Sequence, residues 1–148
     1  MDKKLQDQIT SIIDDVDDMT IATIREDGYP QATTVSYVND GLTVYFATAK
    51  NSQKANNIAK NNKVSLTIDR DYQHWNGIES LSMGAIAEPV NDTEEIEKVS
   101  SLMFEKFPEV TQYAADGMND VAFFRIQPKV ISLLDYSREF GHTELIKL

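Results

Sequence analysis

Four lysines and no acidic residue lie within residues 45–63, although the chain as a whole is acidic. The segment reads YFATAKNSQKANNIAKNNK and contains Lys50, Lys54, Lys60 and Lys63. The 148-residue chain carries 24 acidic and 14 basic residues, a formal net charge of −10. Because such a charge repels anions at long range, an anionic ligand must be captured locally. The lysine segment is therefore the first place to look for anion-binding chemistry.

A strand that ends near residue 49 and a helix that begins near Ser52 would place these lysines around a helix N-terminus. Ser52 is a favourable N-cap. The first amides of a helix have no internal partner and the helix dipole is positive there, which suits a phosphate. Lys50 and Lys54 at this position oppose the dipole unless an anion binds between them. We therefore expect a phosphate site here. The alternative is that the lysines are solvated surface residues, which fits Lys60 and Lys63.

Other residues allow further chemistry, each with a plainer alternative. Trp75, the only tryptophan, could cover a ligand ring bound to the same subunit or to a second one. Alternatively, it could fill a barrel end or a dimer interface. His74 and His142, the only histidines, could transfer a proton or ligate haem iron, or be solvated. Arg125 and Arg138 could contact a ligand, but a strand arginine such as Arg125 more often pairs with an acid. We expect no metal site and assign no catalytic residue.

The elements that would position these groups are mainly strands. Residues 3–16 have helical apolar spacing, as does a longer helix capped by Asp92 and closed by Pro108. Strands are predicted over residues 19–26, 32–38, 42–49, 64–69, 78–90 and 121–136, with turns at residues 27–30 and 39–41. Pro128 indicates an edge or a bulge, Gly117 lies in an expected loop, and the last twelve residues can add a short strand. Short strands with turn signals favour an antiparallel barrel.

Composition narrows the functional class. The length fits one domain, residues 1–148. The absence of Cys excludes disulfides and thiolate metal sites. We find no signal peptide and no membrane span, so we expect a cytoplasmic protein that binds no membrane. The acidity argues against nucleic-acid binding.

The ordered series GYPQATTVSYV, LTVYFATAKNSQKANNIAKNNKVSLTID and SMGAIAEPV resembles the FMN-binding split barrels of the pyridoxamine 5′-phosphate oxidase-like superfamily, over residues 3–136. The resemblance implies a mainly β, α+β fold: a six-stranded antiparallel split β-barrel with an N-terminal helix and two further helices. It also implies a homodimer with one FMN in each of two interface clefts.

The same resemblance assigns site residues. The flavin phosphate would be held by Ser52 and Lys54 with help from Lys50, while Gln53 stands where many relatives have Arg. The residues that would meet the edge of the flavin ring come from two strands: Thr33, Thr34, Val35 and Ser36, and Phe46, Ala47 and Thr48.

The implied function is an FMN-dependent oxidoreductase that transfers hydride between the flavin and a nicotinamide or small organic substrate. The C-terminal segment LDYSREFGHTELIKL lacks the Arg-rich pattern of the oxidase itself, so the chain resembles the short general-stress-type relatives. The alternative is a non-enzymatic flavin- or haem-binding stress-response protein of the same fold. A third possibility, an oligonucleotide-binding barrel, is disfavoured by the acidity.

Overall fold

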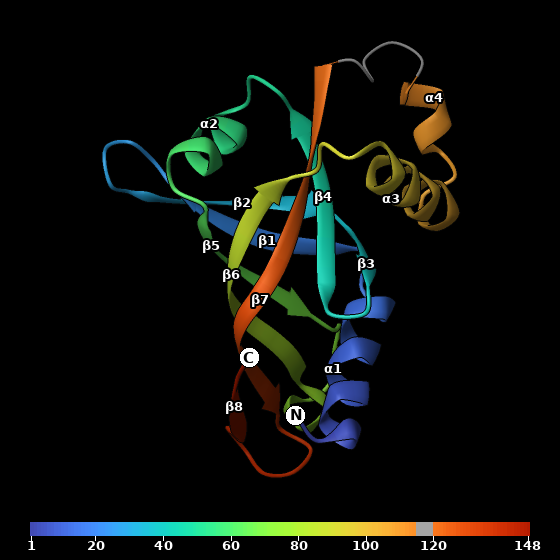
Figure 1. Cartoon of the computed structure of the whole chain (residues 1–148). Coiled ribbons are helices and arrows are strands. Elements are labelled where there is room, and N and C mark those ends of the chain that lie inside the picture. The colour runs from blue at the N-terminus through green and yellow to red at the C-terminus, as the bar shows by residue number, and fades with distance from the viewer. Residues whose placement is uncertain (115–119) are drawn as a thin grey trace.

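The computed structural model describes residues 1–114 and 120–148, so the loop expected around Gly117 lies outside the described residues. Its centre is one antiparallel sheet in the order β2-β1-β5-β6-β7-β4-β3, with β8 paired to β7 (Figure 1). The strands are β1 (Asp18–Ile24), β2 (Pro30–Ser36), β3 (Val38–Asp40), β4 (Thr43–Ala49), β5 (Lys63–Asp69), β6 (Glu79–Pro89), β7 (Val121–Asp135) and β8 (Thr143–Lys147).

Helices flank this sheet. They are α1 (Lys3–Asp15), α2 (Gln53–Lys60), α3 (Thr93–Lys106) and α4 (Val110–Ala114), with a short 3₁₀ turn η1 (Trp75–Gly77). The predicted caps are found: the Ser52 side chain accepts from the Ala55 amide, and Asp92 accepts from the Glu95 amide. No helix in the described parts of the chain is long and apolar enough to cross a membrane.

The sheet curls because its two edge strands follow one another directly in the chain. β2 lies at one end of the strand order and β3 at the other, yet only Tyr37 separates them. Tyr37 is fully buried and donates its hydroxyl to the Ile13 carbonyl at 2.6 Å, which fixes this corner against α1. Buried side chains from five strands, including Ile21, Phe46 and Leu66, fill the curled interior. The result is a barrel with an open seam between β2 and β4.

The expected antiparallel split barrel is therefore confirmed, with more elements than the sequence suggested. Val38 was expected to end the second strand and residues 39–41 to form a turn, but a corner at Tyr37 ends β2, and Val38–Asp40 form the separate strand β3. The chain also adds β8, where a short strand was anticipated, and α4, where a loop was expected. The irregularity expected at Pro128 is present as a register shift, because Gly84 pairs with Val130 while Ala85 pairs with Pro128.

Candidate functional site

The seam of the barrel is bounded by two strand edges with unused backbone groups. β2 pairs with β1 along its whole length, and among the described residues it has no partner on its other side. β4 pairs with β7 from Val44 to Ala49, but with β3 only from Thr43 to Tyr45. Residues 33–36 and 46–48, which the resemblance assigns to the flavin ring, therefore lie on the two strands that flank the seam. Their backbone amides and carbonyls are the groups that could hydrogen-bond the edge of a planar ring.

The side chains of these residues point in different directions. Thr33 and Val35 face inward, whereas Thr34 and Ser36 are exposed on the outer face. The Phe46 ring lies in the core, stacked on Phe124 at 5.5 Å, so Phe46 can offer only its backbone to a ligand.

The N-terminus of α2 stands at one end of this seam. The Ser52 hydroxyl oxygen accepts from the Ala55 amide and from the Thr48 hydroxyl, both at 3.0 Å. With both acceptor positions used, the Ser52 O–H remains as a donor for an anion. Thr48, which we expected at the ring, is thereby tied to the N-terminus of α2.

Lys54 is the least compensated cation in the lysine segment. It is half-buried, and no carboxylate of the described residues pairs with it. Burial lowers the pKa of Lys54, because removing water disfavours the ammonium form. By contrast, Lys60 pairs with Glu26 at 2.9 Å and is a surface residue, as the alternative interpretation expected. Lys50 is exposed at the loop before α2.

A buried polar layer beneath α2 was missed by the sequence analysis. Asn57 is 3% exposed and donates to Thr23 at 2.9 Å and to Gln31 at 3.4 Å, while Gln53 donates to Asn57 at 2.7 Å. These bonds join α2 to β1 and β2 and so hold the helix N-terminus over the seam. The signal was present in the sequence, because Asn57 lies next to Ile58 on the apolar side of a short helix.

One hydroxyl at this end has no partner. The Oγ1 atom of Thr33 is buried and makes no hydrogen bond within the structure. Thr33 follows Gln31 on the inward face of β2. A buried polar atom without a partner costs free energy, so its retention suggests a ligand or water as partner.

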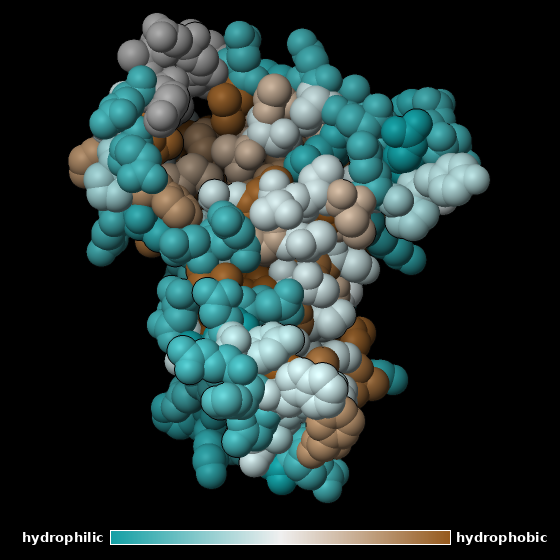
Figure 2. All heavy atoms as spheres, turned by 180° about the vertical axis from the view of Figure 1, so that it is seen from behind, coloured by the Kyte–Doolittle hydropathy of each residue, from teal (hydrophilic) through white to brown (hydrophobic). Residues whose placement is uncertain are grey.

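A pocket of about 380 Å³ adjoins the seam where β2 meets Tyr37. Its strand wall consists of Val35, Ser36, Tyr37 and Ala47, and its other wall comes from α3, α4 and their connection. The space-filling view from behind shows an apolar hollow on the upper part of the molecule (Figure 2). Residues predicted from both strands thus meet at one cavity.

The structure does not bring Trp75 to this seam within one chain. β5 begins next to α2 and ends before η1, so Trp75 lies at the opposite end of β5. The Trp75 side chain is 65% exposed and lies 5.7 Å from the Phe140 ring, centroid to centroid. Only contact with a second copy could place it near a ligand in the seam.

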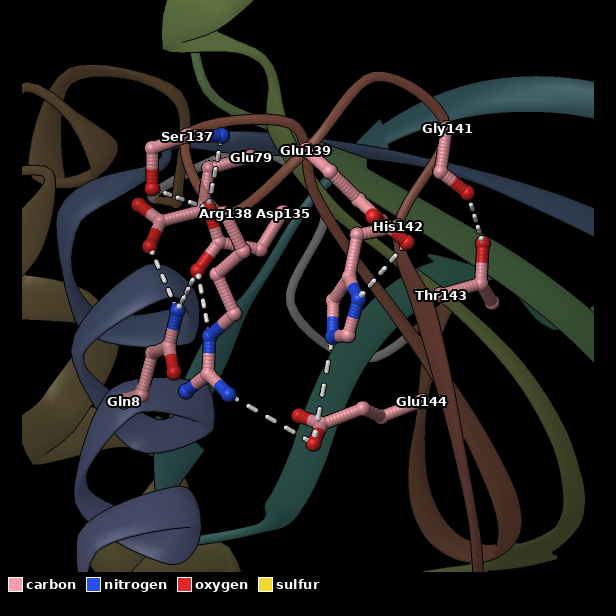
Figure 3. Close-up of polar contacts among 10 residues, drawn as sticks. All are labelled: Gln8, Glu79, Asp135, Ser137, Arg138, Glu139, Gly141, His142, Thr143 and Glu144. Carbon is pink, nitrogen blue, oxygen red and sulfur yellow. Dashed lines mark hydrogen bonds and ion pairs between the residues drawn. The ribbon is translucent and has the colours of Figure 1, made fainter.

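The histidines also lie away from the seam. His74 is exposed next to η1. His142 lies in the β7–β8 hairpin, with Nδ1 4.0 Å from a Glu139 oxygen and Nε2 3.9 Å from a Glu144 oxygen (Figure 3). The expected exterior pairing of Arg125 is confirmed, since it pairs with Glu88 and Glu95.

Arg138 and its neighbours form a structural network at this hairpin. Asp135, only 6% exposed, accepts from the Gln8 amide at 2.9 Å, from the Ser137 hydroxyl, and from the Ser137 amide at 3.1 Å, and it pairs with Arg138 at 3.4 Å (Figure 3). Gln8 also donates to Glu79 at 2.9 Å, so the network joins α1 to β6 and β7. Among the described residues, no group of three or more acidic or histidine side chains could hold a metal ion.

Solved structures support the fold. The chain superposes on a haem-binding protein from Mycobacterium smegmatis with a TM-score of 0.83 at 14% identity, covering 99% of this chain and 59% of that one. HutZ, a haem storage protein from Vibrio cholerae, gives 0.70 at 22% identity, covering 84% and 89%. General Stress Protein 26 from Bacillus anthracis gives 0.71 at 20% identity, covering 97% and 98%.

Sequence comparison defines the family. No curated protein sequence matches the chain. A family model described as Pyridoxamine 5′-phosphate oxidase matches residues 5–135, which is most of the chain. The protein therefore belongs to the pyridoxamine 5′-phosphate oxidase family.

Proposed function

We propose that this protein binds FMN, with the phosphate at the N-terminus of α2 and the ring along the seam. The described residues fit the group. Lys54 supplies a half-buried cation without a carboxylate partner among these residues. Ser52 supplies a hydroxyl whose O–H is free to donate, and Thr33 supplies a buried hydroxyl that makes no hydrogen bond to any described residue. Bound flavin would supply hydride-transfer chemistry, and the chain would supply binding and orientation. The observation that carries the proposal is Lys54, because a desolvated ammonium at a helix N-terminus calls for an anion.

The test compares FMN with riboflavin, which lacks the phosphate. Lys54→Ala is expected to raise the FMN dissociation constant by about tenfold or more, since a charge-assisted contact is lost, and to leave riboflavin affinity unchanged. Lys63→Ala removes the same charge from an exposed position beyond α2 and is the matched control. Quenching of flavin fluorescence measures each constant. Equal losses in both variants, or wild-type protein that binds FMN no better than riboflavin, would refute the phosphate site.

Oxidoreductase activity is the next step of the same proposal, with hydride exchanged between FMN and a nicotinamide or small organic molecule. The open edge of the seam leaves one side of a bound ring accessible, which direct transfer requires. Anaerobic addition of NADH or NADPH to the FMN-loaded protein should bleach the flavin absorbance. A loaded protein that stays yellow with both donors would favour storage or sensing of FMN over catalysis.

We also propose that two copies form a homodimer through the outer face of the sheet. The outward positions of β2, β1, β5 and β6 form two cross-strand rows: Thr34, Thr20, Thr67 and Ser82, and Ala32, Ala22, Ser65 and Gly84. All are small and uncharged in a chain whose residues are 26% charged. The cores of protein interfaces are depleted of charge, which makes this face the best candidate for a partner copy.

Charge introduced into these rows tests the dimer. Ser65→Arg is expected to give monomers in light scattering and to weaken FMN binding, if the cleft needs both copies. Ser101→Arg places the same side chain at an exposed position of α3 and should leave the dimer intact. Wild-type protein that is monomeric at high concentration would exclude this interface.

Haem is the second candidate ligand, supported by two similar structures, the haem-binding protein from Mycobacterium smegmatis and the haem storage protein HutZ. In this chain His142 is the better axial ligand, because its buried Nε2 has no hydrogen-bond partner among the described residues. Titration with haemin would distinguish the candidates. A Soret band that is lost in His142→Ala, with no FMN binding in the wild type, would replace the flavin proposal.

A further inference from the structure

The pocket beside the seam has a second wall made by helices. Met103 comes from the C-terminal end of α3 and Val110 from α4, while Phe107 and Glu109 come from the connection between these helices. The volume of about 380 Å³ falls within the range of small-molecule sites. Because its strand wall shares residues with the proposed flavin site, a molecule in this pocket would lie beside the flavin.

Two cations near this wall, Lys106 and Arg125, make contacts elsewhere in the protein. Lys106, next to Phe107, donates to the carbonyls of Val16 at 2.7 Å and Tyr37 at 3.0 Å, with its ammonium 4.0 Å from the Tyr37 ring centroid. Arg125, on the face of β7 under α3, is held by two glutamates. Lys106 is thus anchored to two main-chain carbonyls and is not one of the described residues that line the pocket. The charge of Arg125 is offset by its two carboxylate partners.

Of the described residues that line the pocket, Glu109 alone carries a charge. Its side chain is exposed at the rim. An anionic group entering such a pocket would lose water without gaining a cation or a set of donors, which is unfavourable. The pocket is thus expected to bind apolar molecules and to disfavour the binding of anions.

We propose that this pocket is the substrate site and takes an uncharged, apolar or aromatic molecule rather than a phosphorylated or carboxylated one. The assignment rests on the proposed function, since it is the neighbouring flavin that makes the ligand a substrate. The selectivity follows from the walls: apolar side chains from two strands and two helices, with one carboxylate at the entrance. The phosphate-binding capacity of this protein is then confined to the start of α2.

Two fluorescent probes that differ by one sulfonate test this selectivity. N-phenyl-1-naphthylamine is neutral, and 8-anilino-1-naphthalenesulfonate carries one negative charge on the same aromatic frame. With FMN-loaded protein the neutral probe is expected to bind about tenfold more tightly than the sulfonate, because the pocket offers no cation. Equal binding, or tighter binding of the sulfonate, would overturn the inference.

Reversal of the rim charge locates the binding site. Glu109→Lys is expected to tighten sulfonate binding by about threefold, the size of a screened rim charge, and to leave the neutral probe unchanged. Glu105→Lys makes the same change at an exposed position of α3 that does not line the pocket, and should alter neither probe. Equal responses in the two variants would place the probe elsewhere, against the inference.

A blocking variant and a separate flavin titration complete the test. Val110→Trp adds bulk to the helical wall and is expected to abolish binding of the neutral probe while FMN affinity stays unchanged. Retained probe binding would overturn the assignment. FMN titration of the same samples reports the flavin site independently. Loss of probe selectivity with normal FMN binding rejects only the pocket assignment. Absent FMN binding with normal selectivity rejects the flavin, and with it the substrate role, but not the selectivity of the pocket.

Discussion

Both ends of the barrel contain partly buried charged side chains, but these side chains differ in whether other residues of the chain bind them. At the hairpin end, Asp135 accepts bonds from Gln8 and Ser137 and pairs with Arg138. At the α2 end, Lys54 is half-buried without a carboxylate partner in the described chain. A charge whose bonds are all made within the chain indicates a structural role, and one left without a partner indicates a place for a ligand.

The largest effect should come from removing the satisfied charge. Asp135→Ala removes the acceptor of the Ser137 hydroxyl and one of the two acceptors of the Gln8 side-chain amide, so we expect the free energy of unfolding to fall by about 2–4 kcal/mol. Urea denaturation measures this loss. Asp71→Ala, at an exposed aspartate, is the control and should stay within about 0.5 kcal/mol. If the two variants unfold alike, the hairpin network has no structural role.

The polar layer under α2 should give the next largest effect. Asn57→Ala breaks its bonds to Thr23 and Gln31 and is expected to cost about 2 kcal/mol, because buried partners lose their hydrogen bonds. Asn56→Ala makes the same substitution at the exposed neighbouring position of α2. Thermal denaturation of both variants separates the buried bond from helix propensity. A difference below about 0.5 kcal/mol would contradict the anchoring role.

The cap residue offers a way to separate stability from ligand binding. Ser52→Asp keeps a good N-cap and adds a favourable charge for the helix dipole, so stability should change by less than about 0.5 kcal/mol. The same charge repels a phosphate, and FMN affinity should fall by about tenfold or more. Asn62→Asp, beyond the far end of α2, is the matched control in fluorescence titration. Unchanged FMN affinity in Ser52→Asp would move the phosphate away from this helix.

Two inward-facing threonines on paired strands sharpen the comparison further. The Thr23 hydroxyl accepts from Asn57 at 2.9 Å, whereas the buried Thr33 hydroxyl has no hydrogen-bond partner in the described part of the chain. Thr23→Val is expected to destabilise the protein by about 1–2 kcal/mol, and Thr33→Val to leave stability unchanged or slightly higher. Riboflavin affinity should fall a few-fold only in Thr33→Val, as measured by titration. A stability loss in Thr33→Val as large as that in Thr23→Val would show that its hydroxyl serves the fold.

Local patterns predicted the elements well because their causes are local. The Ser52 cap, the buried stripe of α1 and the irregularity at Pro128 each depend on a few neighbouring residues. The start of β3 depends on a corner at Tyr37, which is set by packing against α1, and no neighbouring residue indicates it.

The site was predicted less completely because its supports are distant in sequence. Asn57 bonds to Thr23, 34 residues away, and this contact exists only after the sheet has formed. The resemblance named the strands at the seam, but the helical wall of the pocket came from the structure alone. Trp75 was named as a possible cover for the bound ring. It lies far from the seam because β5 runs from beside α2 to the opposite end of the barrel, and the sequence alone did not show this direction.

The smallest expected effect is a difference in how pH acts on the two ends. Burial alone would raise the pKa of Asp135, but the bonds from Ser137 and Gln8 bring it below its usual range. The stability it contributes is therefore present above its unfolded pKa of about 3.9 and is lost as pH falls through the folded value. Burial lowers the pKa of Lys54, so folding releases protons there, and stability rises with pH as the solution approaches the unfolded value of about 10.4.

Urea denaturation across pH, with and without FMN, tests this contrast. Asp135→Asn should reduce only the loss of stability at acid pH. Lys54→Met should reduce only the gain of stability at alkaline pH. Bound phosphate favours the ammonium form of Lys54, so FMN should suppress the alkaline rise in the wild type but leave the acid limb unchanged. If stability still rises at alkaline pH under saturating FMN, the phosphate does not contact Lys54, wherever else the FMN binds.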